Sequence, residues 1–287
     1  MSQNHSFASY QYRHYKILSE LEKIETNKEF KKILKKFAEH EWKDFVFWKE
    51  HDQKKEFKLN VLTLITIKIM RKILGLTFVV KYLEREEKDL LKHYHEYANQ
   101  IKDPAQKAKI KQAIEHEIQH EQELIAQIKE ERVEFISSII LGINDGLIEL
   151  TGALVGFTLA LQNNTLIALT GAITGIAASL SMASSAFMQA QYEPGKNPAK
   201  AALYTGLAYI IVVILLVFPF LITNTIGNAL TILGLTVATI ITAISYYTSI
   251  LFERPFAKQI SQMALFSVGT AIITFLIGLL LRHWVII

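Results

Sequence analysis

The stretch GINDGLIELTGALVGF, residues 142–157, lies in the first long apolar segment of the chain, yet it carries two carboxylates, Asp145 and Glu149. The two acids are four positions apart, so they share one face of a helix. A charged side chain at the centre of a bilayer costs at least about 2.5–3.5 kcal/mol. If this segment spans a membrane, both acids are therefore expected to face the interior of a helix bundle or a water-filled cavity.

Five segments are long and apolar enough to span a membrane, for which about 20 residues suffice. They comprise residues 137–161, 165–190, 201–222, 227–251 and 263–281. Apart from the two acids of the opening stretch, these segments contain no Asp, Glu, Lys or Arg. The sequence therefore predicts an integral membrane protein whose C-terminal domain, residues 133–287, consists of five transmembrane helices in contact with membrane lipid.

The charged residues gather in the first part of the chain: residues 1–136 hold 49 of the 58 Lys, Arg, Asp and Glu residues. This part shows no strand alternation, and its periodicity predicts an all-α domain over residues 1–132. The predicted helices are residues 4–24, 27–52, 60–74, 76–100 and 104–132. The net charge of +4 is spread among many acids, which argues against a nucleic-acid partner.

The basic residues of the connecting segments predict the orientation in the membrane. The second and fourth breaks between the apolar segments contain Lys196, Lys200, Arg254 and Lys258, whereas the first and third contain no Lys or Arg. Basic loops stay in the cytoplasm. The N-terminal domain is therefore expected to be cytoplasmic and the C-terminus outside.

The predicted helix at residues 60–74 is apolar but carries three cations, Lys68, Arg71 and Lys72. Three cations within this segment make it unfavourable as a membrane-spanning helix. Two interpretations remain open: the helix is buried in its domain, or it lies at the membrane interface with its cations toward the headgroups.

Three of the cytoplasmic helices place acids or a His on their apolar stripes: Glu41 and Asp44, Glu84 and Glu87, and Glu117 and His120. Inward-facing acids repel one another, so a cation is expected to hold them together. Ferritin-like bundles do this with two metal ions, bound by one Glu from each of two helices and a Glu-x-x-His from each of the other two.

The pair Glu117 and His120 matches this pattern fully, whereas the pair Glu41 and Asp44 has Asp in place of His. The first helix offers Gln11 where Glu is expected. The hypothesis is a dimetal centre that holds Fe²⁺/Fe³⁺ or Mn²⁺. The alternative is a domain without metal, because helices rich in Lys and Glu place acids at many positions by chance.

The two membrane acids also allow two interpretations. They form either a hydrogen-bonded pair between helices, with one or both protonated, or a cation and proton site, the default for an ionisable residue in a membrane. Asn144 adds an amide oxygen, and Met182 in SLSMASSAF of the second apolar segment adds a thioether. Carboxylates together with sulfur suit Fe²⁺ or Mn²⁺. Taken alone, Met182 also fits simple packing.

Three runs carry a resemblance to a known family: EERVEFISSIILGINDGLIELTGALVGFTLAL, GAITGIAASLSMASS and AALYTGLAYI. The chain resembles the vacuolar iron transporter family, specifically the prokaryotic members with an N-terminal rubrerythrin-like (ferritin-like) domain. The resemblance implies a homodimer with the pathway at its interface, and proton-coupled export of Fe²⁺ or Mn²⁺ across a prokaryotic cell membrane. The family's first-span acid falls on Asp145 and its second-span Met on Met182.

The chain departs from the family pattern in two places. The family often has an acid a few residues beyond the second-span Met, where this chain reads Ala-Ser-Ser-Ala at residues 183–186. The loop between the second and third spans is short and keeps only Glu193, whereas eukaryotic members place a Glu-rich metal-binding domain there. The hypothesis is that the N-terminal domain collects metal instead and delivers it to the pore, or senses it. Ferroxidase activity of that domain, in a membrane-anchored enzyme without transport, remains the alternative.

Overall fold

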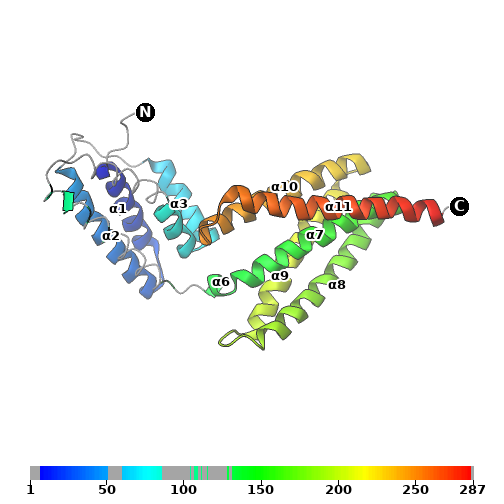
Figure 1. The fold of residues 1–287 in the computed structure, drawn as a ribbon, viewed down its shortest axis with the longest axis horizontal. Helices are drawn as coiled ribbons and strands as arrows, with labels where there is room; N and C mark the ends of the chain where they lie inside the picture. Colours follow the sequence, from blue (N-terminus) through cyan, green and yellow to red (C-terminus); the bar gives the residue numbers. More distant parts are fainter. Residues whose placement is uncertain are drawn as a thin grey trace. The chain divides into compact units, whose positions relative to one another are not determined.

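The computed structural model describes residues 7–50, 60–85 and 131–285, together with single positions between 104 and 128. The chain divides into two units, Met1–Glu130 and Glu131–Ile287. Every regular element in the described parts is a helix, as predicted (Figure 1).

The second unit contains five helices long and apolar enough to cross a membrane. They are α7 (Ile136–Leu161), α8 (Asn164–Ala190), α9 (Pro198–Ile222), α10 (Ile226–Leu251) and α11 (Phe256–Val285), preceded by the short α6 (Glu131–Glu134) (Figure 1). The number of apolar helices confirms the prediction from the sequence.

Two of these helices begin three or more residues before their apolar segments, and both begin next to a proline. Helix α9 has Pro198 in its first turn and Asn197 as its cap, whose side chain accepts from the Lys200 N–H. In α11 the N–H groups of Lys258 and Gln259 donate to the Pro255 carbonyl. A proline suits a first helical turn because that turn has no partner for its N–H groups. Helix starts therefore extend into the polar breaks.

Helix α7 contacts each of the other four long helices of the second unit, and α9 packs against both α7 and α8. A cluster of buried apolar side chains joins α7, α8, α9 and α10. Its fully buried members include Leu147, Leu154, Ile167, Tyr209 and Leu216.

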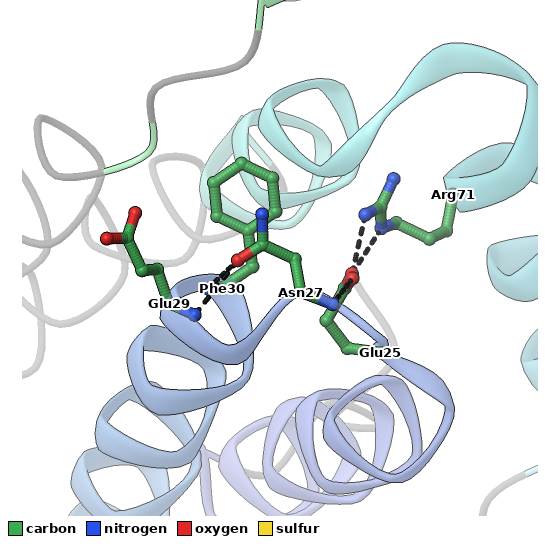
Figure 2. Close-up of polar contacts among 5 residues, drawn as sticks. All are labelled: Glu25, Asn27, Glu29, Phe30 and Arg71. Atoms are coloured by element: carbon green, nitrogen blue, oxygen red, sulfur yellow. Dashed lines mark hydrogen bonds and ion pairs between the residues drawn. The ribbon is translucent and has the colours of Figure 1, made fainter.

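The first unit is built on α1 (Phe7–Ile24) and α2 (Lys28–Lys49), which pack along each other. Asn27 caps α2, because its Oδ1 accepts from the N–H groups of Glu29 and Phe30 at 2.9 and 3.2 Å (Figure 2). Such caps satisfy N–H groups that have no partner within the helix. Helix α3 (Val61–Leu74) ends at Gly75, whose φ of 101° lies in the region that favours glycine. Residues 76–85 are again helical.

Two ion pairs fix α3 to α1 and to the turn that follows it. The Arg71 guanidinium donates twice to Glu25 Oε2, at 3.0 and 2.5 Å (Figure 2). Lys68 Nζ lies 3.1 Å from Glu20 Oε2. Burial alone raises the pKa of Glu25, but the Asn27 N–H and the Arg71 guanidinium outweigh it, so that the pKa lies below its usual value. The carboxylate thus joins the α1–α2 turn to α3.

We expect Arg71→Met to weaken the attachment of α3 by about 1.5–3 kcal/mol at neutral pH, as is typical for hydrogen bonds to a charged group. Because the folded-state pKa of Glu25 is lowered, this contribution is present above the unfolded pKa and is lost as pH falls through the folded pKa. Hydrogen exchange of the α3 amides, corrected for intrinsic rates, measures it. The exposed Lys72→Met is the matched control. Equal loss of protection in both variants would contradict the assignment.

Candidate functional site

The two membrane acids lie one turn apart on α7, as the sequence predicts. Asp145 is half-buried, whereas Glu149 is exposed on the single chain. Glu149 Oε2 accepts a hydrogen bond of 2.8 Å from the hydroxyl of Tyr209 on α9, and Tyr209 is fully buried. The bond fixes one oxygen of the Glu149 side chain.

Helix α9 approaches α7 closely enough to place this tyrosine because α7 presents glycines to it. A Cβ on Gly142 would clash with the Thr205 carbonyl oxygen, and a Cβ on Gly146 would lie 3.3 Å from the Tyr209 ring. The hydroxyl of Thr205 donates to the Ser138 carbonyl at 3.1 Å. The two polar contacts, at Ser138 and Glu149, therefore flank the two glycine contacts and set the register of the two helices.

Asn144 has a different environment from the two acids. Its Oδ1 is buried and has no hydrogen-bond partner among the described residues. The residue lines a cavity of about 320 Å³ among α7, α10 and α11, whose polar lining includes Thr248, Arg254, Gln259 and Gln262. Neither Asp145 nor Glu149 lines this cavity, so Asn144 and the acids border different spaces.

Met182 is half-buried on α8 and packs against the apolar cluster that contains Tyr209. Its side chain is therefore partly covered by the apolar core of the second unit. Ser184 and Ser185 on the same helix are exposed and donate their hydroxyls to backbone carbonyls one turn earlier.

In the first unit, three of the predicted metal ligands are almost completely buried, namely Gln11, Glu41 and Glu84, and so is His14, three residues after Gln11 on α1. His14 Nδ1 lies 3.5 Å from Glu41 Oε1, so α1 and α2 contribute to one polar cluster. The Oε1 of Gln11 is buried without a hydrogen-bond partner among the described residues. Buried carboxylates, an imidazole and an amide oxygen are a donor set that fits Fe²⁺ or Mn²⁺.

Asp44 pairs with a residue on its own helix, since His40 Nε2 lies 3.2 Å from its Oδ2. The His40 side chain is only 13 % exposed. Three further predicted ligands, Glu87, Glu117 and His120, lie outside the described residues. Among the residues that are described, no group of three or more His, Asp or Glu comes together around one point.

Tyr209 is the residue that sequence reasoning missed. Its span is apolar on all sides, so periodicity singles out no face. A signal was nevertheless present, because a tyrosine hydroxyl buried in a membrane helix needs a hydrogen-bond partner. The two acids of α7 were the available strong acceptors.

Comparison with protein families gives a match to the VIT family over residues 136–195, which comprise α7, α8 and the loop that follows. The match supports the resemblance to the vacuolar iron transporter family and, together with the five apolar helices, an integral membrane protein that transports a metal ion. It covers the two acids and Met182, whereas the first unit lies outside it. No curated protein and no solved structure matches the chain.

Proposed function

We propose that the membrane unit exports Fe²⁺ or Mn²⁺ from the cytoplasm in exchange for protons, with Asp145 and Glu149 as the shared ion and proton site. The observation that carries the proposal is the pair of carboxylates on one face of α7, within the segment that matches the family. Acids in a membrane helix are costly, so their presence points to function.

The proposed exchange follows from competition at the carboxylates. A metal ion binds only the deprotonated form, so binding of metal releases protons and protonation releases metal. Metal from the cytoplasm would displace protons from the acids, and protons from outside would later displace the metal. Tyr209 holds Glu149 in one orientation, and Met182 is the proposed soft ligand from α8.

The exposure of Glu149 supports a homodimer. An exposed carboxylate in a membrane-spanning helix is unfavourable against lipid, whereas a second copy of the chain would cover it. Because a two-fold interface brings the same surface of each copy together, the acids of both copies would line one shared pathway. The lysines and arginines of the α8–α9 and α10–α11 loops favour a cytoplasmic first unit.

Uptake into liposomes loaded with a metal-sensitive dye tests the proposal directly. With an imposed pH gradient, the full-length protein should carry Fe²⁺ or Mn²⁺, and collapse of the gradient should stop net flux. Absence of flux together with iron oxidation by the full chain would favour the membrane-anchored ferroxidase. One apolar helix would suffice to anchor an enzyme, and the described part of this chain contains five.

We expect Tyr209→Phe to lower the flux about tenfold, because loss of a hydrogen bond to a charged group typically costs at least about 1.5 kcal/mol. The substitution removes only the hydroxyl that Glu149 accepts from and leaves the ring against Gly146. Tyr246→Phe, at an exposed tyrosine of α10, is the control. Unchanged flux in Tyr209→Phe would show that the bond does not position the acid.

For the first unit we propose metal binding and delivery, or metal sensing, rather than catalysis. The buried contact between His14 and Glu41 favours a bound cation, and so does the buried oxygen of Gln11, which has no hydrogen-bond partner among the described residues. Oxidation to Fe³⁺ would give a poor substrate for a divalent exporter. A bound metal would supply positive charge that neutralises the inward-facing acids.

Metal content of the purified full chain tests this role. Glu41→Gln should lower the amount of metal retained by the protein, whereas Glu39→Gln on the exposed side of α2 should not. Both variants keep the membrane acids, so their metal at Asp145 is unaffected. Equal metal content in both would indicate that the first unit is only a scaffold.

A further inference from the structure

Helix α3 is apolar on two opposite sides. One side is covered, since Ile67 is buried and Leu64 and Met70 pack against the core of the first unit. The other side is open, and its large aliphatic side chains are between 49 % and 69 % exposed: Val61, Leu62, Ile65, Ile69 and Ile73. We call these five residues the exposed face of α3.

An apolar surface of this kind is unusual in a polar domain. Among the described residues of the first unit, the other large apolar side chains with high exposure are Ile24, Trp42 and Val46, on α1 and α2. Contiguous exposed apolar patches mark interaction sites. We therefore expect the exposed face of α3 to be covered by another surface that binds it.

The ion pairs of α3 fix the direction in which this face points. Arg71 is held by Glu25, in the turn that follows α1 (Figure 2). Lys68 is held by Glu20 of α1, so both cations lie on the side where α3 meets its own unit. Lys72, in contrast, is exposed and lies one turn after Ile69. The two paired cations lock the helix in place and leave one cation beside the apolar side chains.

The charge around α3 indicates what covers it. Residues 51–74 contain six basic residues and two acidic ones. A basic segment with an apolar helix face is typical of a helix that lies on a membrane surface with anionic lipids. Anionic headgroups would complement the cations that the two ion pairs of α3 leave available, such as the exposed Lys72, and the acyl boundary would cover the aliphatic side chains.

The chain itself keeps the first unit near a bilayer. Glu130 ends this unit, and the first membrane-spanning helix begins at Ile136. The five residues between them reach at most about 20 Å when fully extended. A membrane surface is therefore available to the unit at all times, at the high effective concentration of a short tether.

We propose that the exposed face of α3 docks into the headgroup region of an anionic membrane surface, so that α3 anchors the first unit on the bilayer that α7–α11 cross. The proposed docking requires the membrane helices, which keep the first unit near a bilayer, but it does not require that the protein transports metal. It would hold the unit's buried polar cluster at a constant height above the bilayer.

The chain has no Cys, so a single introduced Cys can carry a fluorescent label. The full-length protein would be labelled at Ile65→Cys with NBD, and at Lys35→Cys, an exposed position of α2, as control. Both would be placed in nanodiscs with and without phosphatidylglycerol. Lipids brominated or spin-labelled near the glycerol would serve as quenchers.

The label at position 65 should show blue-shifted emission and quenching by these lipids, more strongly in anionic nanodiscs, and the label at position 35 should show neither. A water-exposed label at position 65 in both lipids would overturn the proposal. A second result would also overturn the proposal. If unlabelled Ile65→Cys forms a disulfide between two copies of the chain, and the labelled protein shows no quenching by lipid, then a second chain covers the face instead of a membrane. Equal quenching in neutral and anionic nanodiscs would refute the role of the cations. Ile73→Cys repeats the test at a second position.

Discussion

Asp145→Asn is expected to abolish metal uptake driven by a pH gradient. Asn has nearly the same size and keeps the half-buried position on α7, but it neither carries a charge nor exchanges a proton near neutral pH. Loss of an outer-shell partner alone typically lowers metal affinity 10–100-fold. We therefore expect loss of the carboxylate itself to lower flux by more than about 100-fold in the liposome assay.

Removal of an acid elsewhere provides the control for this prediction. Glu193 lies in the loop between α8 and α9, where the Lys196 ammonium at 2.8 Å lowers the pKa of its carboxyl. Glu193→Gln removes one negative charge outside the apolar helices and should transport as the wild type does. Normal transport by Asp145→Asn would show that the site assignment is wrong, even if wild-type flux confirms a transporter.

The fold of the membrane unit was largely predictable because length and apolar character decide whether a segment spans a bilayer. The number of apolar helices followed from that criterion alone. Two helix starts were missed, at Pro198 and Phe256, because hydropathy ends at the first charged residue whereas the helix does not. Caps and prolines, not hydropathy, determine where a helix begins.

The site was predictable in part. Two acids in one apolar segment are recognisable as candidate site residues because a charged side chain in a bilayer costs free energy. The structure places them one turn apart on α7. The sequence could not show that Glu149 is exposed on a single chain. Composition indicates that a carboxylate in an apolar segment must be shielded from lipid, but it does not indicate whether the same chain or a second copy shields it. Tyr209 was missed for a related reason: a helix that is apolar on all sides has no periodic signal.

In the first unit the helix pattern predicted α1, α2 and α3, but not the partner of each polar side chain. Asp44 and Glu41 are three residues apart and fit one motif, yet Asp44 pairs with His40 and Glu41 with His14. An i, i+4 neighbour on the same helix competes with a partner across the core. The ferritin-like arrangement of this unit remains a prediction that rests on its motif residues.

Gly142→Ala is expected to destabilise the membrane unit more than any other single methyl addition to a helical glycine. The added Cβ would clash with the Thr205 carbonyl oxygen and lie 3.2 Å from the Ala208 Cβ. The first of these is a backbone atom of α9, so the clash cannot be relieved by a change of rotamer. Helix α9 would have to move away from α7.

Such a movement would also disturb the polar contacts on both sides of the glycine. The Thr205 hydroxyl donates to the Ser138 carbonyl one turn before Gly142, and Tyr209 donates to Glu149 two turns after it. Overpacking in a tight core typically costs about 1–3 kcal/mol, and we expect the upper end here. Equilibrium unfolding in mixed micelles measures the loss, and the liposome assay should show reduced flux because Glu149 loses its positioning bond.

Gly234→Ala in α10 is the matched control, since a Cβ there meets no atom within 4 Å. It changes the same residue type in another apolar helix, so it reports the intrinsic effect of the substitution without a clash. It should unfold at the same denaturant concentration as the wild type or slightly above it, because Ala favours helix over Gly. If both variants are equally stable, α7 and α9 do not approach as closely as the Gly142 contact requires. The proposed positioning of Glu149 by Tyr209 would then lose its structural basis.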